Sequence, residues 1–299
     1  KETGATVDIK AAKEMDGVIV SSKGDVIIAA EYFESGAYIS EEGIVRLIYE
    51  KTMSGVHAAS KTKSVELFVG YRADYTETGT PADAIDVTAD AYTFAEIYAT
   101  GNIKDAVISA ATGYANVYAD QSIIDTHVSA QGLIDVYANY ISGMNAVTFD
   151  SIDAMALTDI YGSKLVAGKD VLVGALGSIY DTSAIADGDA MLVAVGNVGN
   201  TNVIADTVEM IANGSIMNSS ATAVNGVIVS ADDYINGSTI LNGQGYVAMV
   251  AGKGIDSSDI TNLDGYINVK SPLILNSSFA ASGDKGAVTL DGGDNGISL

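Results

Sequence analysis

Apolar residues recur along this chain with a period of about 19 residues, as from Ile141 to Ile160. The middle apolar position of successive repeats keeps nearly this spacing through Ile103, Ile123, Ile141, Ile160, Ile179, Val198, Ile216, Ile235, Ile255 and Leu273. A second ladder of mostly small residues runs through Ala99, Ala119, Ala138, Leu157, Ala175, Val195, Ala212, Ala231 and Ala251. A fixed period of this length indicates a repeat protein, because each unit is too short to bury its own apolar face and must stack on its neighbours.

Each repeat opens with a segment in which apolar residues alternate with others, such as Val171, Val173 and Ala175. Alternation with a period of two is typical of a β-strand, whose successive side chains point to opposite faces. Short strands that recur in every repeat describe the coils of a single-stranded parallel β-helix, in which like residues stack about 4.8 Å apart. We therefore expect an all-β fold, a β-solenoid, with one repeat domain of about 15 coils over residues 1–299.

Turn chemistry supports the same fold. A polar turn follows the middle position in many repeats, beginning for example at Asp181, Asn200 and Asn218. Asn, Asp and Ser side chains hydrogen-bond to nearby backbone groups in turns. The 32 glycines suit many tight turns, and the 2 prolines suit a fold in which a proline would remove a ladder hydrogen bond.

One departure from the period lies near the N-terminus. The strand register jumps from Leu67 directly to Ile97, which is about half a repeat more than the other steps. Residues 71–84 are polar and contain Gly79 and Pro81, which interrupt regular structure. We expect an inserted loop at 71–84 that projects from the coils and is the most mobile internal segment, with Ile85, Val87 and Ala89 resuming as the third strand.

The repeat resembles the coil of filamentous-haemagglutinin-type bacterial exoproteins, which are exported by two-partner secretion. Residues 225–235, NGVIVSADDYI, and residues 23–30, KGDVIIAA, carry the likeness. The resemblance implies a right-handed parallel β-helix and a secreted or cell-surface protein that acts in adhesion or as an extracellular fibre. The Asn-Pro-Asn motifs of that family's secretion domain are absent, so the likeness is to the repetitive shaft.

Two other classes of protein share short β-helical coils. Bactofilin-like cytoskeletal polymers would make the chain intracellular. Polysaccharide-cleaving β-helix enzymes need convergent acid and base groups in a cleft walled by loops. This chain offers one long insertion and only two arginines, Arg46 and Arg72. We therefore expect a non-catalytic structural or adhesive protein, since a fold alone does not establish an activity.

Charge limits the classes of partner. The formal net charge is −23, which disfavours nucleic acids and anionic membranes, because phosphate binding needs clustered lysine and arginine. No apolar run is long enough to span a bilayer, so we expect no membrane insertion. The absence of cysteine excludes disulfides and thiolate metal sites.

Acidic and histidine side chains are the candidates for metal or catalytic chemistry. The closely spaced carboxylates are Asp187, Asp189, Asp256, Asp259, Asp291 and Asp294. Their spacing matches neither an EF-hand loop nor the tandem repeats of calcium β-rolls, so we interpret them as solvated turn residues. His57 and His127 fall in different repeats. We expect no metal site, no catalytic residue and no cofactor.

Three tyrosines form the first candidate interaction surface. Tyr98, Tyr118 and Tyr137 occupy one outward position in successive repeats and should stack as an exposed aromatic strip. Such a strip can hold a glycan or a receptor protein, or it can simply stabilise neighbouring strands.

Outward positions of the later repeats form the second candidate surface. Where polar residues are expected, the sequence has Leu172, Leu192, Ile211, Ile228 and Val250, which together predict a continuous apolar strip. We expect another layer to cover this strip through self-association or lateral packing in a fibre. The alternative is a monomer that tolerates an apolar face.

Overall fold

Parallel strands in successive coils make up the computed structural model, which describes residues 5–293 and 296–298. The chain divides into two compact units, Lys1–Asp153 and Ala154–Leu299. Each coil contains three segments, here called A, B and C; in one coil they are β8 (Ala95–Ala99), β9 (Ile103–Lys104) and β10 (Val107–Ala110). The described part of the chain contains strands and turns and no α-helix, so the predicted all-β solenoid is confirmed.

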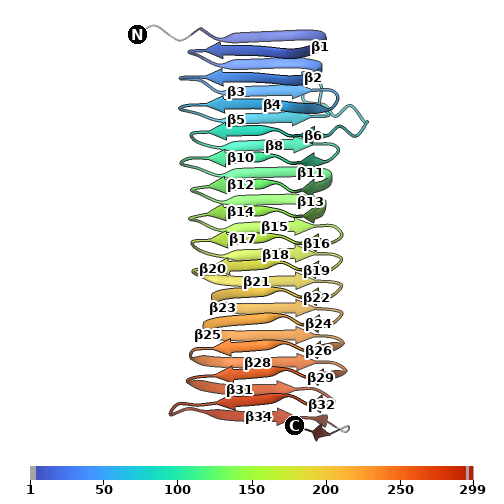
Figure 1. The fold of residues 1–299 in the computed structure, drawn as a ribbon, viewed down its shortest axis with the longest axis vertical. Coiled ribbons are helices and arrows are strands. Elements are labelled where there is room, and N and C mark those ends of the chain that lie inside the picture. Colours follow the sequence, from blue (N-terminus) through green and yellow to red (C-terminus); the bar gives the residue numbers. More distant parts are fainter. Residues whose placement is uncertain (1–4, 294–295, 299) are drawn as a thin grey trace. The chain divides into compact units, whose positions relative to one another are not determined.

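The first unit is drawn from blue to green in Figure 1. Several of its strands are long and run without a break through two neighbouring segments of a coil. Its remaining strands are β1 (Val7–Ser22), β2 (Val26–Ser40), β3 (Val45–Tyr49), β4 (Met53–Ser60), β5 (Val65–Val69), β6 (Ala84–Ile85), β7 (Thr88–Ala91), β11 (Ala115–Ile124), β12 (His127–Ala130), β13 (Ile134–Ser142) and β14 (Asn145–Thr148).

The second unit begins within β15 (Ile152–Ala156) and repeats the same segments. Its other strands are β16 (Ile160–Tyr161), β17 (Lys164–Ala167), β18 (Val171–Ala175), β19 (Ile179–Tyr180), β20 (Ser183–Ala186), β21 (Asp189–Ala194), β22 (Val198–Gly199), β23 (Asn202–Ala212), β24 (Ile216–Met217), β25 (Ser220–Ala231), β26 (Tyr234–Asn236), β27 (Thr239–Asn242), β28 (Gly245–Ala251), β29 (Gly254–Asp256), β30 (Asp259–Asn262), β31 (Gly265–Lys270), β32 (Ile274–Leu275), β33 (Ser278–Ala281), β34 (Ala287–Asp291) and β35 (Ile297–Ser298).

The coil period fixes the register of the ladders. Ala115 pairs with Ile134, and Ala190 pairs with Val208, in each case one coil later. Val65 pairs with Ala95, so the register is kept across the insertion. Like positions therefore stack in columns, and the inward columns fill each unit with Ile, Val, Leu and Ala side chains that are almost fully buried.

The predicted middle ladder forms the B segments. Ile103, Ile123 and Ile141 pair in register in the first unit and are fully buried. In the second unit, the ladder from Ile160 to Ile255 is also fully buried. The assignment of Leu273 is wrong, because Ile274 pairs with Ile255 and has no exposed surface.

Two members of the predicted small-residue ladder are also wrong by one residue. Ala194 pairs with Ala175 and is buried, whereas the next residue, Val195, is 49% exposed. Leu157 is likewise 46% exposed beside the buried Ala156. Because side chains alternate along a strand, a shift of one residue moves a side chain from the core to the surface.

The predicted polar turns after the B segments are confirmed. Asp181, Asn200 and Asn218 take the left-handed conformation, with φ of 51°, 52° and 49°, which Asn and Asp tolerate better than most residues. The residue after each is a buried Thr or Ser. Thr182 Oγ1, for example, donates to the backbone carbonyl of Tyr180 at 3.0 Å, so its hydroxyl is satisfied locally.

Thr182→Val is expected to lower the stability of the second unit by about 1 kcal/mol, because one buried hydrogen bond is lost while the side-chain shape is kept. The shift of the denaturant midpoint in chemical unfolding measures it. Thr239→Val, at an exposed position of the same unit, is the control and should change the midpoint little. An equal shift in both variants would contradict the assigned role of the buried hydroxyl.

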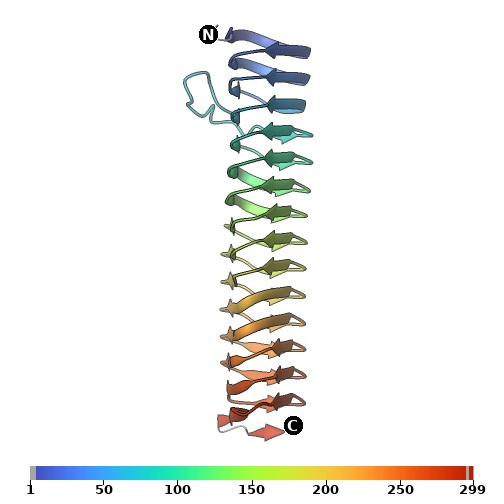
Figure 2. The same cartoon turned by 90° about the vertical axis from the view of Figure 1, so that its left-hand side faces the viewer.

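The insertion connects β5 to β6 and projects beside the coils of the first unit, as Figure 2 shows. It contains a short antiparallel bridge between Tyr71 and Glu77. It ends one residue earlier than expected, because the buried Ala84 already pairs in register with Ile103. The third strand of this coil is β7, whose inward residues are Ala89 and Ala91, so its assignment to Ile85, Val87 and Ala89 was wrong.

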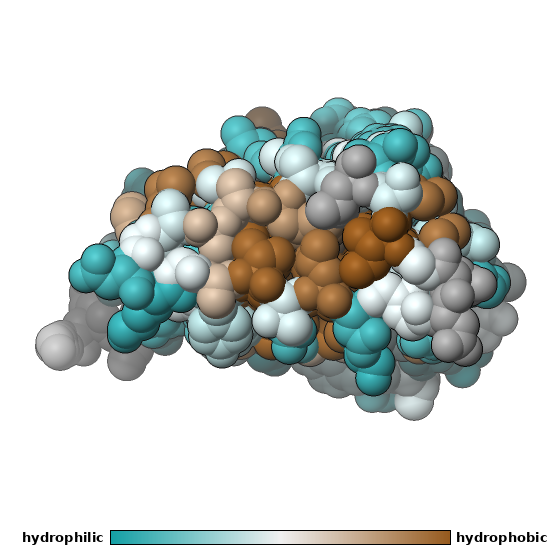
Figure 3. Space-filling model, turned by 90° about the horizontal axis from the view of Figure 1, so that it is seen from below, coloured by the Kyte–Doolittle hydropathy of each residue, from teal (hydrophilic) through white to brown (hydrophobic). Residues whose placement is uncertain are grey.

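The last described coil of the second unit leaves core side chains partly uncovered. Val288 is 41% exposed and Ile297 is 45% exposed, although both stand at inward positions. Figure 3 shows the resulting group of apolar side chains at this end of the unit.

Candidate functional site

A column of four stacked aromatic side chains lies on the outward face of the A segments in the first unit. Phe68, Tyr98, Tyr118 and Tyr137 are register partners on β5, β8, β11 and β13. Ring centroids are 5.3 Å apart for Phe68 and Tyr98, and 5.2 Å apart for Tyr98 and Tyr118. The sequence-based prediction of a tyrosine strip omitted Phe68, which the register jump across the insertion places next to Tyr98.

The stacking of the rings decides which part of each ring is accessible to solvent or to a partner. The Phe68–Tyr98 and Tyr98–Tyr118 pairs are within 5° of parallel, so these rings cover each other's faces and direct their edges outward. Tyr137 is tilted by 36° from Tyr118, and its side chain is 39% exposed. The column therefore stabilises the coils along its length, and Tyr137 is the ring with the most accessible surface.

A polar column runs beside the aromatic one. Glu66, Glu96, Asn116 and Asp135 are register partners on the same strands. Glu96 accepts hydrogen bonds from the Tyr114 hydroxyl at 3.2 Å and from Asn116 Nδ2 at 3.1 Å. The Tyr118 hydroxyl donates to Asp135, which joins the two columns. The face thus carries a polar side chain in each of the four coils and a phenol hydroxyl in three of them, while Glu66 itself is buried against Arg46.

Burial and mutual repulsion change the acid–base properties of this face. Burial raises the pKa of Glu96, the nearby charge of Glu66 adds to the increase, and the bonds from Tyr114 and Asn116 oppose it. Burial and then the charge of Asp135 raise the pKa of Asp153. Burial, followed by the charge and hydrogen bond of Glu96, raises the pKa of Tyr114 to about 12. Ionisation of Glu96 and of Asp153 is therefore less favourable in the folded protein than in the unfolded chain.

Glu96→Gln is expected to raise the melting temperature at pH 7 and to have little effect at about pH 4. Since folding raises the pKa of Glu96, ionisation of this group costs stability above its folded pKa, and the cost disappears as the pH falls below its unfolded value. Melting curves measured across this range test the expectation, with the exposed Asp120→Asn as the control. A lower melting temperature of Glu96→Gln at pH 7 would contradict it.

The insertion is anchored to this face. Arg46 Nε and Nη2 both lie 2.6 Å from Glu66 Oε2, and Arg46 Nη1 donates to the Tyr75 hydroxyl at 3.1 Å. Tyr71 and Tyr75 pack edge-on against Phe68, with ring centroids 5.8 Å and 5.3 Å away. Sequence reasoning missed this contact, because nothing in the local pattern relates the insertion to β3 and β5. The root of the loop is ordered by these contacts, while its predicted mobility stays a prediction.

No protein-family model, curated protein or solved structure matches this chain. The filamentous-haemagglutinin resemblance therefore rests on the repeat itself.

The register of the strands in the second unit decides which residues of the predicted apolar strip face outward. Leu172, Ile211 and Ile228 lie outward and are half-buried, and Val250 is 46% exposed. Leu192 was placed wrongly, because it pairs with the inward Val173 and has no exposed surface. The coil that contains Leu192 is displaced by one residue relative to the sequence-based alignment, which turns its side chain into the core. The strip is therefore not continuous through all five predicted positions.

The candidates for metal chemistry do not form a cluster. Among the described residues, no group of three or more His, Cys, Asp or Glu side chains could hold a metal ion. Asp294 lies outside the described residues. His57 and His127 lie in β4 and β12 of different coils. Within the described ranges, no helix is long and apolar enough to cross a membrane.

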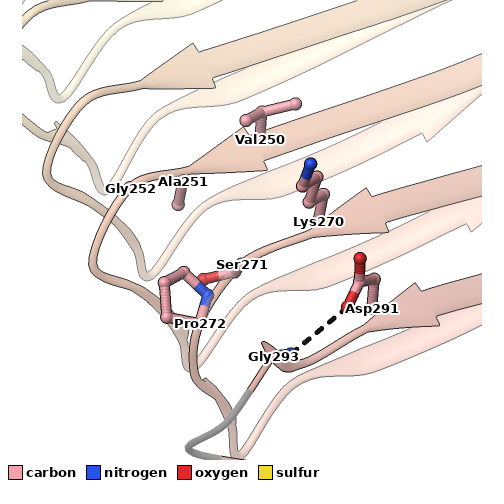
Figure 4. A pocket seen from close by; sticks show the side chains of 8 residues that line it. All are labelled: Val250, Ala251, Gly252, Lys270, Ser271, Pro272, Asp291 and Gly293. Atoms are coloured by element: carbon pink, nitrogen blue, oxygen red, sulfur yellow. Dashed lines mark hydrogen bonds between the residues drawn. The ribbon is translucent and has the colours of Figure 1, made fainter.

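A surface hollow of about 470 Å³ lies at the corner of the last coils of the second unit, shown in Figure 4. Its lining consists of Val250, Ala251, Gly252, Lys270, Ser271, Pro272, Asp291 and Gly293. Lys270 and Asp291 are register partners on β31 and β34, and Asp291 accepts a bond from the backbone nitrogen of Gly293 at 3.3 Å. This lining is mostly small and apolar, without the several convergent polar groups that orient a ligand.

Proposed function

We propose that this chain is part of the repetitive β-helical shaft of a large secreted or cell-surface bacterial protein, related to filamentous-haemagglutinin-type exoproteins. It would act in adhesion or in an extracellular fibre, without catalysis and without a cofactor. The observation that carries the proposal is the face of aromatic and polar side chains, which occupies the same two positions of four consecutive A segments. Repetition of this kind offers many equivalent weak contacts to an extended partner.

The chemistry of the face indicates the kind of receptor. Its carboxylates and hydroxyls can accept hydrogen bonds from the hydroxyl groups of a glycan, and the accessible ring of Tyr137 can pack against a sugar. The net charge of −23 disfavours anionic glycans. A neutral host or cell-surface glycan is therefore the receptor that this face fits best.

Glycan binding is tested by titrating the protein with neutral oligosaccharides and following the intrinsic tyrosine fluorescence. The double variant Tyr137→Ser and Asp135→Asn is expected to bind at least tenfold more weakly than the parent. Tyr234→Ser is the matched control, since Tyr234 is 47% exposed on the second unit and should leave binding unchanged. No binding to any neutral glycan, or equal loss in both variants, would contradict the adhesive role.

Localisation is tested separately by treating intact cells of the source bacterium with protease and detecting this chain with an antibody. A surface protein is degraded before the cells are lysed. Protection until lysis would contradict the proposal and would favour the intracellular bactofilin-like polymer.

A further inference from the structure

A hollow of about 290 Å³ lies on the outward face of three consecutive B segments of the second unit. These segments are β26, β29 and β32, which lie next to one another in Figure 1. The middle residue of each is a fully buried isoleucine, so the residues before and after it point outward. The outward residues that line the hollow are Tyr234, Asn236, Gly254, Asp256, Leu273 and Leu275.

The hollow exists because Gly254 has no side chain between those of Tyr234 and Leu273. The Tyr234 ring leans over this glycine, since a Cβ added to Gly254 would lie 3.2 Å from two carbons of the ring. The Tyr234 side chain is 47% exposed, and Leu273 and Leu275 are half-buried in the following coil. The hollow therefore has an aromatic wall on one side of the glycine and an aliphatic wall on the other.

Asp256 is the charged residue of the lining, and it is half-buried. Its Oδ1 accepts hydrogen bonds from Ser257 Oγ at 3.1 Å and from Asn276 Nδ2 at 3.0 Å. Among the described residues, neither a donor to Oδ2 nor a lysine or arginine is bonded to this carboxylate. The hollow thus combines apolar walls with a negative charge that no cation of the chain balances.

The tyrosine of this hollow already holds one ammonium group elsewhere on its ring. Lys253 Nζ lies 5.9 Å from the centroid of the Tyr234 ring and 2.5 Å from Asp233 Oδ1. The face of an aromatic ring attracts cations electrostatically, and a nearby carboxylate adds to the attraction. Lys253 is not part of the lining. Tyr234 and Asp256 therefore present inside the hollow the same pair of groups that binds Lys253 outside it.

We propose that this hollow binds a small organic cation of the alkylammonium class and fits a quaternary ammonium group best. The ring of Tyr234 contacts the cationic head, and Asp256 balances its charge. Leu273 and Leu275 contact the alkyl carbons around the nitrogen, which removes their apolar surface from water. A quaternary nitrogen needs no hydrogen-bond acceptor, which suits a lining that is mostly aromatic and aliphatic.

The lining disfavours the other classes of small ligand. An anion would meet Asp256 on a chain whose net charge is −23. A metal ion needs several ligand atoms, and no group of three or more His, Cys, Asp or Glu among the described residues could hold one. A neutral sugar needs more convergent hydrogen-bonding groups than Asp256 and Asn236 provide. The hollow does not involve the aromatic face of the first unit, so the inference is independent of the proposed function.

Ligand-observed NMR with choline as the probe tests the proposal, because saturation transferred from the protein to the N-methyl protons reports binding directly. The parent is expected to bind choline with a dissociation constant of roughly millimolar size, and more weakly at high salt. The second probe, 3,3-dimethyl-1-butanol, has the same shape but no charge. It is expected to bind about tenfold more weakly.

Two variants separate the contributions of the ring and the carboxylate. Tyr234→Leu keeps an apolar wall but removes the ring, and it is expected to weaken choline binding about threefold. Asp256→Asn removes the charge with little change of shape, and it is expected to weaken binding about fivefold. Asp259→Asn is the matched control, since it removes the same charge from an exposed position outside the lining and should leave binding unchanged. Melting curves establish that the variants are folded.

Equal binding of choline and its uncharged analogue would overturn the proposal, because the hollow would then recognise only an apolar shape. The absence of saturation transfer from the parent would overturn it, as would equal loss in Asp256→Asn and the control. A soluble cation and the choline headgroup of a lipid share this chemistry. Co-sedimentation of the protein with phosphatidylcholine vesicles assigns the headgroup as the ligand, and binding of free choline alone assigns a soluble one.

Discussion

Ile141→Asp is expected to destabilise the first unit by about 4 kcal/mol or more, enough to prevent most of the protein from folding. Ile141 has no exposed surface and stacks in register on Ile123. An aspartate there would bury a carboxylate among the isoleucines of the B ladder, with no cation or hydrogen-bond donor in its column. Protonation would reduce the cost of the charge but would still leave a polar group in an apolar column.

Soluble yield and the melting curve of the purified protein measure this effect. Asn139→Asp is the matched control, because it introduces the same charge nearby on β13 at an exposed position. The control should express and melt close to the parent. If Ile141→Asp also melts like the parent, the stacking of the B ladder is wrong.

The fold could be predicted from the sequence because its information is repeated many times. A single strand with an ambiguous pattern says little about the fold. Inward positions such as Ile123 and Ile141, however, recur at the coil period, and their side chains can be buried only when the coils stack. The turns were predictable for the same reason, since Asn200 and Asn218 place the same side-chain chemistry at the same point of successive coils.

Single-residue errors came from coils whose length departs from the common period. Some coils are slightly shorter or longer than others, and the pattern does not show in which turn a residue is gained or lost. Where apolar residues adjoin, as at Leu192 and Val193 or Ala194 and Val195, both alignments satisfy the alternation equally well. The structure decides for Leu192 and Ala194 as the inward residues, and this shift divides the predicted strip.

The position of the aromatic face could be predicted from the sequence, but the orientation of its rings could not. Register alone places Tyr98, Tyr118 and Tyr137 in one column, but not the direction of their rings. Face-to-face stacking turns most of that column into a stabilising element, which leaves Tyr137 as the ring best able to contact a receptor. Contacts of the insertion with Phe68 and Arg46 join segments far apart in the pattern and required the structure.

The central claim is that stability comes from in-register stacking of interchangeable coils, and deletion of one coil tests it most directly. Removal of residues 208–226, a whole coil, joins Thr207 to Val227. Val227 then takes the place of Val208 on Ala190, and each later column keeps its inward side chains inside. Removal of residues 208–216 alone, half of that coil, instead joins Thr207 to Met217 and puts a turn where an A segment is needed.

Thermal melting followed by circular dichroism compares the two deletions with the parent. The whole-coil deletion is expected to keep a cooperative transition within a few degrees of the parent, because it removes one repeat and one interface. The half-coil deletion is expected to lose most of its β-signal or to melt far lower. Equal damage by both deletions, or a half-coil deletion that melts as high as the whole-coil one, would contradict the account.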